Sequence, residues 1–315
     1  MHGEDNETLQ QRADIAMYSA KQSGRGHAIF EPELDRHSPR RLALAGGLRS
    51  AISEGQIQLY FQPKADLRTG RIMGVEALAR WDHPEFGIVG PAEFVPIAEQ
   101  TGLITPLTSF VLDAALGQAR AWRDAGLELT VAVNLSARSF LDTQLAVEIP
   151  RLLARWGVDA EQLELEITES MLMTDPARAE ATLDRLSQIG LALSIDDFGT
   201  GYSSLANLKR LPVDVIKIDK SFVIEMALDA SDAAIVRSTI ELAHNLGLRV
   251  VAEGVESEDA WRQLESLGCD FAQGYYLSRP LPADAATRMI RERGTARDIE
   301  LLAPPALRVV QGLAR

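Results

Sequence analysis

The sequence predicts an α/β protein, a (β/α)8 barrel whose first strand runs antiparallel to the others. Short β-branched segments alternate with amphipathic helical segments between about residues 45 and 292. Eight of these segments are predicted strands, and a span of about 250 residues is the usual size of such a barrel. An open, doubly wound sheet is the alternative arrangement.

The predicted strands are rich in β-branched residues and are bounded by turn residues. They cover residues 58–67, 72–81, 130–136, 163–168, 191–197, 214–219, 248–254 and 269–274. Only a short turn around Thr69 and Gly70 separates the first two, which is too short for a helical crossover and predicts a hairpin. We therefore expect the first strand to be antiparallel.

The helices predicted between the strands include residues 107–125, 144–156, 176–189, 231–246 and 257–267. Most of them are followed by a glycine, the residue that most readily ends a helix: Gly126, Gly157, Gly190, Gly247 and Gly268. The repeated order of strand, helix, glycine and strand predicts parallel pairing through helical crossovers.

Three zones divide the chain. Residues 1–38 contain an amphipathic helix, a glycine-rich stop at 24–26 and a short strand at 27–30, which cannot bury a core alone. Residues 39–292 form the predicted barrel domain. Residues 293–315 form a tail without a functional signal.

Composition excludes several classes of protein. With 45 acidic residues against 32 Lys and Arg in 315 residues, the net charge of −13 argues against polynucleotide binding. No apolar run is long enough to span a membrane, and the first residues lack the apolar core of a signal peptide, so we expect a cytoplasmic location. The single cysteine, Cys269, excludes an internal disulfide, and the five histidines lack zinc-site spacing. Any metal must therefore have oxygen ligands.

Polar side chains stand near the ends of strand after strand. They are Glu76, Asn134, Glu166, Asp196, Asp197 and Glu253. An unpaired carboxylate inside a barrel strand is costly to desolvate, and side-chain alternation directs Glu76, Asn134 and Glu166 away from their apolar neighbours and into the barrel mouth. Such oxygen-rich sites suit Mg²⁺ or Mn²⁺, and paired ions favour phosphoester cleavage. The alternative, surface acids that balance nearby bases, explains one such residue more easily than the whole series.

Two further features adjoin these acids. The segment DFGTGYSSL (197–205) contains Gly199 and Gly201, which allow a mobile turn, and Glu169 could anchor this loop by accepting backbone N–H bonds. Lys217 lies in a predicted strand and could form a Schiff base if it were neutral. So many carboxylates should keep it protonated, which favours a role in positioning an attacking water.

Eight ordered motifs resemble those of the EAL-domain phosphodiesterases, which hydrolyse the bacterial second messenger cyclic di-GMP. They are FQPK (61–64), EALARW (76–81), NLS (134–136), ELEITES (164–170), DDFGTGYSSL (196–205), KIDKSF (217–222), AEGVE (252–256) and QGYYLSRP (273–280). The resemblance covers about residues 45–292.

This resemblance implies a modified TIM barrel, two Mg²⁺ or Mn²⁺ ions, and cleavage of cyclic di-GMP to linear pGpG by a water between the ions. The implied ligands are Glu76, Asn134, Glu166 and Asp196 for the first ion and Asp196, Asp197 and Glu253 for the second. Lys217 would lie beside the water, and the general base is either Glu253 or the metals themselves. Ca²⁺ should fill the site unproductively.

The resemblance also implies residues around this centre. Substrate contacts are expected at Gln62, Leu78, Arg80 and Gln273, with Arg80 suited to a phosphate oxygen. Glu169 is the expected loop anchor, and Glu256 and Gln273 are expected to order water. Because no ligand position is lost, we expect an active enzyme. The alternatives are a catalytically silent cyclic di-GMP receptor and a Schiff-base lyase acting through Lys217.

The first zone looks like the last helix and strand of a GGDEF diguanylate cyclase domain, on the residues RADIAMYSAKQSGRGHAIFEPEL. The cyclase signature loop is absent from this chain, so cyclase activity is not expected of it. The resemblance implies upstream GGDEF and sensory domains in a longer protein, which could be anchored to a membrane. Relatives often dimerise, so a homodimer is expected.

Overall fold

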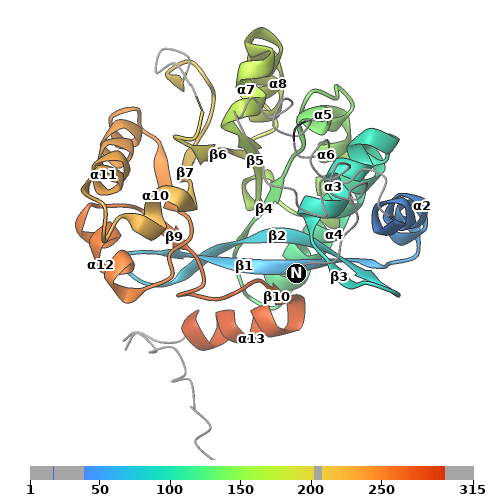
Figure 1. Cartoon of the computed structure of the whole chain (residues 1–315), viewed down its shortest axis with the longest axis horizontal. Coiled ribbons are helices and arrows are strands. Elements are labelled where there is room, and N and C mark those ends of the chain that lie inside the picture. The colour runs from blue at the N-terminus through green and yellow to red at the C-terminus, as the bar shows by residue number, and fades with distance from the viewer. Residues whose placement is uncertain (1–16, 18–38, 202–207, 295–315) are drawn as a thin grey trace, which may run out of the picture. The chain divides into compact units, whose positions relative to one another are not determined.

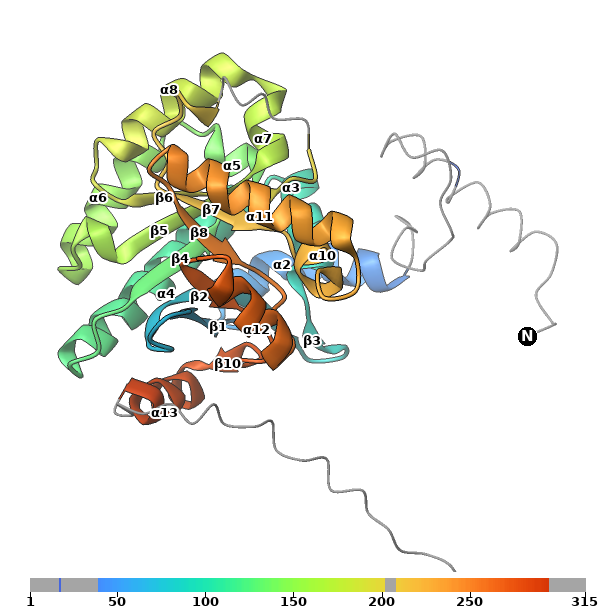
Figure 2. The same ribbon diagram turned by 90° about the vertical axis from the view of Figure 1, so that its left-hand side faces the viewer.

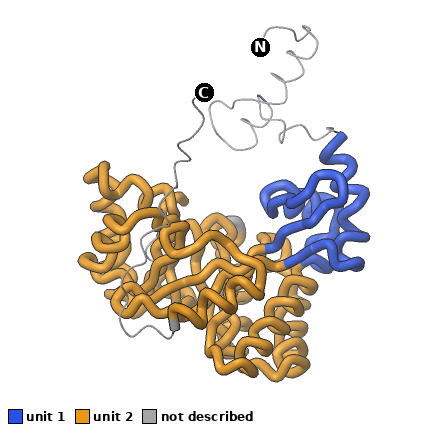
Figure 3. The backbone as a smooth tube through the Cα atoms, turned by 90° about the horizontal axis from the view of Figure 1, so that it is seen from below, with its two compact units in different colours: residues 1–58, 79–107 blue, residues 59–78, 108–315 orange. Residues whose placement is uncertain are grey.

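The computed structural model describes residue 17, residues 39–201 and residues 208–294. The chain divides into two compact units, Met1–Gln58 with Ala79–Leu107, and Leu59–Leu78 with Thr108–Arg315 (Figure 3). We call them unit 1 and unit 2 and describe each by itself. The strand predicted at 27–30 and the predicted tail from 295 onward lie outside the described residues.

Unit 2 contains an eight-stranded barrel, to which β1 and β2 contribute all but their ends (Figure 1). Its strands are β1 (Ile57–Asp66), β2 (Ile72–His83), β4 (Thr130–Asn134), β5 (Leu163–Thr168), β6 (Ala192–Phe198), β7 (Val215–Ile218), β8 (Arg249–Ala252) and β9 (Phe271–Gln273). They pair in the order β1-β9-β8-β7-β6-β5-β4-β2, and a pairing of β1 with β2 closes the ring. The predicted barrel is therefore confirmed, and the open sheet is excluded.

The first strand runs against the other seven. β1 pairs antiparallel with β9, with Lys64 opposite Gln273, whereas β2, β4, β5, β6, β7, β8 and β9 pair in parallel. The turn after β1 is closed by the N–H of Gly70, which donates to the carbonyl oxygen of Asp66 at 2.7 Å. Gly70 has φ +64°, a conformation that glycine adopts without strain. The prediction drawn from this short turn is confirmed.

The five predicted helices are present, each with bounds within about three residues of those expected. They are α4 (Ile104–Asp124), α6 (Leu145–Trp156), α8 (Pro176–Ser187), α11 (Ala230–Asn245) and α12 (Glu258–Ser266). α8 packs on β6, and α11 packs on β7 and β8, on the outside of the strands (Figure 2). α6 shows why a helix forms here: Leu145, Ile149 and Leu153 recur every four residues and are buried, and Gly157 ends the helix at φ +58°.

Side-chain alternation on the strands separates the two faces of the barrel wall. Val133 on β4, Leu165 on β5 and Leu193 on β6 face outward and are 0% exposed. Burial of each such side chain contributes about 1.5–3 kcal/mol. The opposite faces of the same strands carry Asn134, Glu166 and Asp196, and these polar residues therefore point into the barrel.

Short elements connect the barrel strands to the long helices. They are α5 (Ala137–Phe140), η2 (Ala160–Gln162), α7 (Glu169–Thr174) and α10 (Lys220–Glu225). The chain after β9 continues into β10 (Leu281–Pro282), which pairs with β1, and then into α13 (Ala283–Gly294). The elements of two to six residues were not predicted because they carry too little periodicity. The 12-residue helix α13 was not predicted either.

Unit 1 holds α2 (Pro39–Ser53), the ends of β1 and β2, β3 (Gly87–Val89) and α3 (Pro91–Thr101). α2 packs on α3, and Arg40 forms an ion pair with Glu93 at 2.8 Å. The indole nitrogen of Trp81 donates to Oε1 of Gln56 at 3.1 Å. In the part of the chain that the structure describes, no helix is long and apolar enough to cross a membrane.

Candidate active site

A buried lysine lies among carboxylates at the carboxyl ends of the barrel strands. Lys217 on β7 is 0% exposed, and its Nζ lies 2.6 Å from Oε1 of Glu253 and 2.8 Å from Oε2 of Glu166. The same nitrogen lies 3.1 Å from Oδ1 of Asp196 and 3.9 Å from Oε2 of Glu76. Acids from β2, β5, β6 and the residue after β8 therefore converge on one ammonium group.

The surroundings of Lys217 decide its charge. Burial alone would lower the pKa of the amine, but the neighbouring carboxylates, Glu166 and Glu253 foremost, raise the pKa of Lys217 well above its usual range. The side chain is therefore an ammonium at neutral pH, as expected from the sequence. An ammonium has no lone pair with which to form a Schiff base.

We call Glu76, Glu166, Asp196, Asp197 and Glu253 the acid cluster. Burial, then the charge of Glu76, raises the pKa of Glu166 well above its usual range. Burial and the charge of nearby acids, against the effect of Lys217, raise the pKa of Glu253 to about 7. Burial and the charges of Asp196 and Asp219 raise the pKa of Asp197 to about 6. Five carboxylates around one lysine thus carry more negative charge than the lysine balances, and a further cation would stabilise them.

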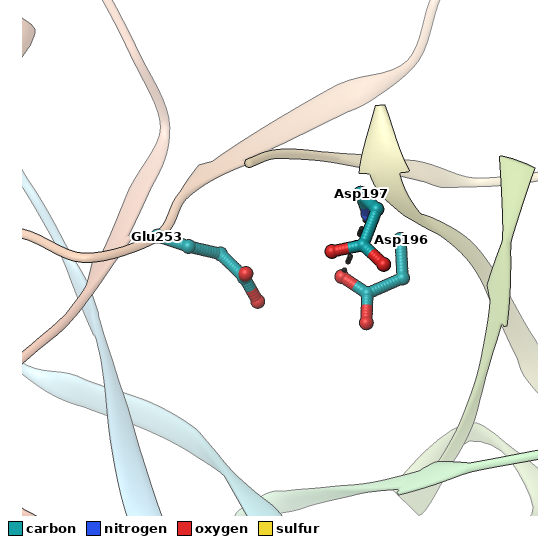
Figure 4. Close-up of side chains that lie close together, drawn as sticks. All are labelled: Asp196, Asp197 and Glu253. Atoms are coloured by element: carbon teal, nitrogen blue, oxygen red, sulfur yellow. Dashed lines mark hydrogen bonds between the residues drawn. The ribbon is translucent and has the colours of Figure 1, made fainter. Parts of the chain in front are cut away.

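Three members of the acid cluster are placed to hold a metal ion. One carboxylate oxygen each from Asp196, Asp197 and Glu253 lies within 4.8 Å of the others, and Glu253 points toward the two aspartates (Figure 4). Oε1 of Glu166 is buried without a hydrogen-bond partner among the described residues, so a carboxylate lone pair is free. A set of hard oxygen donors with unsatisfied charge fits a divalent cation such as Mg²⁺ or Mn²⁺.

A backbone irregularity brings two adjacent aspartates to the same site. Strict alternation would turn Asp197 away from Asp196, but the pairing of β6 with β7 shifts register between Ile195 and Phe198. Asp197 has φ +55°, and its N–H donates to Oδ1 of Asp196 at 3.1 Å. A left-handed conformation is unfavourable for a residue with a side chain, and such strain clusters at functional sites.

Amide side chains hold Glu76 in place. Nδ2 of Asn134 donates to Oε1 of Glu76 at 2.6 Å, which leaves Oδ1 of Asn134 free to accept or to bind a cation. Nε2 of Gln273 donates to Oε2 of Glu76 and also to Oε1 of Gln62 at 3.2 Å. Nε2 of Gln62 donates in turn to the carbonyl oxygen of Ser278 at 3.2 Å. The predicted ligand Glu76 is thus held by two of the predicted site residues, Asn134 and Gln273, and Gln62 binds Gln273 in turn.

The chain matches a known protein family over most of its length. The sequence model of the EAL domain family matches residues 46–280 of the chain. The chain belongs to the EAL domain family. This confirms the family resemblance seen in the motifs. The resemblance of residues 1–38 to the end of a GGDEF domain stays a prediction.

Curated relatives of this EAL domain include two characterised by name. It is 44% identical over 284 residues to the bifunctional diguanylate cyclase/cyclic di-GMP phosphodiesterase MucR of Pseudomonas aeruginosa, covering 90% of this chain and 42% of that protein. It is 39% identical over 290 residues to the cyclic di-GMP phosphodiesterase PdeR of Escherichia coli, covering 91% of this chain and 43% of that protein. The chain thus spans less than half the length of these relatives.

Solved structures are similar to the EAL domain over most of their length. The complex of the PaMucR phosphodiesterase with c-di-GMP has a TM-score of 0.75 at 45% identity, covering 78% of this chain and 99% of that one. The EAL domain of FimX from Pseudomonas aeruginosa, bound to c-di-GMP, has a TM-score of 0.70 at 26% identity, and the match covers 76% of this chain and 96% of that one.

Glu169 lies where a loop anchor is expected in this EAL domain. It is 2% exposed at the start of α7, and its Oε2 accepts the N–H groups of Gly199 at 3.0 Å and Gly201 at 3.3 Å. A Cβ at Gly201 would lie 2.8 Å from Oε1 of Glu169, so a larger residue here would displace the Glu169 carboxylate. Residues 202–207 of the predicted loop lie outside the described residues.

Three predicted residues of the EAL domain remain: Leu78, Arg80 and Glu256. Leu78 is half-buried on β2, and Arg80 lies in unit 1, where Nη1 donates to the carbonyl oxygen of Ala79 at 2.9 Å. Glu256 is exposed between β8 and α12, with no hydrogen bond or ion pair to any described residue. The roles of Leu78, Arg80 and Glu256 stay predictions.

Sequence reasoning missed a second buried ion pair and a neighbour of Asp197. Nζ of Lys64 lies 2.6 Å from Oε2 of Glu164, and both residues are 4% exposed. Asp219, which caps α10, adds to the raised pKa of Asp197. Alternation could have revealed the pair, because Glu164 shares a strand face with Glu166, and Lys64 shares one with Gln62.

Proposed function

We propose that the chain is a metal-dependent phosphodiesterase that hydrolyses cyclic di-GMP to linear pGpG. The observation that carries this proposal is the convergence of Glu76, Glu166, Asp196 and Glu253 on the protonated Lys217. These are the residues that the resemblance to the EAL family assigns to catalysis. Two curated relatives, MucR and PdeR, are cyclic di-GMP phosphodiesterases by name.

Two divalent cations would be held by the acid cluster together with Asn134. When bound, such ions lower the pKa of water and stabilise negative charge on the attacking and leaving oxygens. Mg²⁺ and Mn²⁺ are the proposed ions because every donor is a carboxylate or amide oxygen.

The residues of this chain perform the remaining tasks. Lys217 presents a fixed positive charge at the centre of the acid cluster, where it stabilises the nearby carboxylates and an oxygen nucleophile. Glu253 has a pKa raised to about 7 in the cation-free chain, mainly by burial, and a bound cation would lower this pKa. We assign the removal of the water proton either to Glu253 as general base or to solvent, since bound cations would lower the pKa of the water.

Substrate binding involves the residues around this centre. Gln62, Leu78, Arg80 and Gln273 are the proposed contacts. Cyclic di-GMP carries two negative charges, which the acid cluster would repel unless cations were bound first. The order of binding should accordingly be cation before dinucleotide.

Two other functions make different demands on the same residues. A receptor that only binds cyclic di-GMP would not need all six predicted ligands, yet this chain keeps them. A Schiff-base lyase would need a neutral Lys217, whereas its pKa is raised. The predicted homodimer, the upstream GGDEF and sensory domains and the cytoplasmic location remain parts of the proposal.

Product analysis tests the proposed function. Purified chain would be incubated with cyclic di-GMP and Mg²⁺, Mn²⁺ or Ca²⁺, and the nucleotides separated by chromatography. We expect linear pGpG with Mg²⁺ or Mn²⁺ and intact cyclic di-GMP with Ca²⁺. Binding without any product would favour the receptor. A covalent adduct at Lys217 after borohydride treatment would favour the lyase.

A further inference from the structure

The barrel contains a second buried ion pair that the proposed mechanism does not use. Nζ of Lys64 on β1 lies 2.6 Å from Oε2 of Glu164 on β5, and both residues are 4% exposed. A buried ion pair is not in itself strong evidence for stability, because desolvation offsets much of the attraction. Its position beneath the acid cluster suggests another role.

Glu164 and Glu166 are two residues apart on β5 and point to the same side of the strand. The Lys64–Glu164 pair therefore lies one layer closer to the amino ends of the parallel strands than the Lys217–Glu166 pair. Both members of the lower pair also line a cavity of about 380 Å³ that is bordered by Thr130, Ala192 and Arg249, the first residues of β4, β6 and β8.

Electrostatics connects the two layers. Oε2 of Glu164 accepts a hydrogen bond from Nζ of Lys64 at 2.6 Å, and Oε2 of Glu166 accepts one from Nζ of Lys217 at 2.8 Å. Oε1 of Glu164 and Oε1 of Glu166 are both buried without a hydrogen-bond partner among the described residues. Each carboxylate thus has an oxygen that could accept a hydrogen bond from Lys217 if Lys64 were absent.

We propose that Lys64 is a positioning residue: by neutralising Glu164, it leaves the ammonium group of Lys217 to the acid cluster above it. Without Lys64, the charge of Glu164 draws Lys217 toward the amino ends of the strands and away from Asp196 and Glu253. This inference rests on the proposed function for its effect on turnover. Its effect on cation binding stands independently of the reaction.

The variant Lys64→Met removes the charge and keeps a long apolar side chain, and the adjoining cavity leaves room for it. We expect kcat to fall about 10- to 100-fold, as for other residues that orient a metal site. KM should change less than about threefold, because the substrate contacts lie elsewhere. The affinity for Mn²⁺ should rise about tenfold, since one positive charge is lost and Lys217 releases the acids. General damage to the site would lower kcat and Mn²⁺ affinity together.

A second substitution supplies the reversal. The double variant Lys64→Met/Glu164→Gln also lacks the negative charge of Glu164, so nothing draws Lys217 away from the acid cluster. Its kcat and Mn²⁺ affinity should therefore return to within about threefold of the parent values. Glu164→Gln alone should lower Mn²⁺ affinity, the opposite sign to Lys64→Met. The matched control is Arg185→Met, which removes a positive charge from the exposed face of α8 and should leave all values unchanged.

Mn²⁺ affinity by isothermal titration and kcat by product formation would be measured on each variant, with circular dichroism to show that each is folded. Parental kcat and Mn²⁺ affinity in Lys64→Met, or a double variant no better than the single one, would overturn the proposal. If the parent chain does not hydrolyse cyclic di-GMP, the proposed function fails. The role of Lys64 would still be decided by Mn²⁺ affinity, which should rise in Lys64→Met, fall in Glu164→Gln and return to the parent value in the double variant. If Lys64→Met does not fold, the Glu164→Gln and double variants decide it by the same titration.

Discussion

The ammonium group of Lys217 lies 2.6 Å from Oε1 of Glu253. Lys217 belongs to β7, and Glu253 directly follows β8, the neighbouring parallel strand. Lys217 lies opposite Val251, and its long side chain reaches toward the carboxyl ends of the strands to meet Glu253, two residues further along the same face. The charge of each is therefore coupled to that of the other, and changes at either position should have distinct consequences.

Replacement of Lys217 by methionine should abolish turnover and make the protein depend on cations for stability. Removal of one partner from a buried ion pair typically costs about 3–5 kcal/mol, because the remaining charge is uncompensated. Mg²⁺ or Mn²⁺ should restore more of the thermal stability of Lys217→Met than they add to the parent. Thermal denaturation with and without cation measures this, and an equal cation effect on both proteins would contradict it.

Glu253→Gln should separate binding from chemistry. Loss of a proton acceptor and cation ligand is expected to lower kcat by about 10²-fold or more. Cyclic di-GMP should still bind in Ca²⁺, because the other acids and the substrate contacts remain. Glu241→Gln, an exposed residue of α11, is the matched control. Parental turnover in Glu253→Gln would remove this residue from the mechanism.

Cation binding should weaken as the pH falls. The pKa of Glu253 is raised to about 7 and that of Asp197 to about 6, so both groups hold protons where exposed carboxyl groups are ionised. Protons then compete with the cation, and affinity should fall by about tenfold per pH unit for each proton displaced. Titration calorimetry with Mn²⁺ from about pH 8 to about pH 6 measures this. Affinity that does not change with pH would contradict it.

The same pKa shifts predict the sign of a stability change. Between their ordinary pKa values of 4.5 and 3.8 and the raised values of about 7 and about 6, Glu253 and Asp197 hold more protons in the folded chain than in the unfolded one. Their contribution to the stability of the cation-free protein should therefore be lost as the pH rises through this window. Added Mg²⁺ should remove the loss, which urea unfolding at several pH values would measure.

Gly274→Ala should destabilise the barrel next to the site. A Cβ at Gly274 would overlap the backbone N and O of Val255, whose N–H donates to the carbonyl oxygen of Gln273 at 3.1 Å. Overpacking of this kind costs about 1–3 kcal/mol, and displacement of Gln273 should also lower activity. The control is Gly46→Ala on α2, where a Cβ would meet nothing within 4 Å. Urea unfolding of both variants measures the difference, and equal stabilities would refute the contact.

Periodicity was sufficient to predict the barrel because most of its strands and helices repeat a strong pattern. The apolar outer face of β5, with Leu163, Leu165 and Ile167, is visible in the sequence, and the short turn at Thr69 and Gly70 reveals the direction of β1. β3 and β10 have three and two residues and were missed, because their pairing depends on β2 and β1 rather than on their own sequence.

The site was harder to derive than the fold. Alternation places Glu76, Glu166 and Asp196 in the barrel, but it cannot show that the register shift at Asp197 keeps this residue beside its neighbour. It also cannot show that Lys64 and Glu164, 100 residues apart, meet inside the barrel. Such contacts depend on how the strands are placed around the ring, which no local pattern records.

The claim that the acids around Lys217 form a cation-dependent hydrolytic centre is tested most directly by restoring cations to stripped protein. Hydrolysis of cyclic di-GMP would be followed in chain treated with a chelator, and again after addition of excess Mg²⁺ or Mn²⁺. We predict no pGpG from the stripped protein and sustained turnover once either cation returns. Hydrolysis that survives the chelator, or no hydrolysis with either cation, would contradict the account.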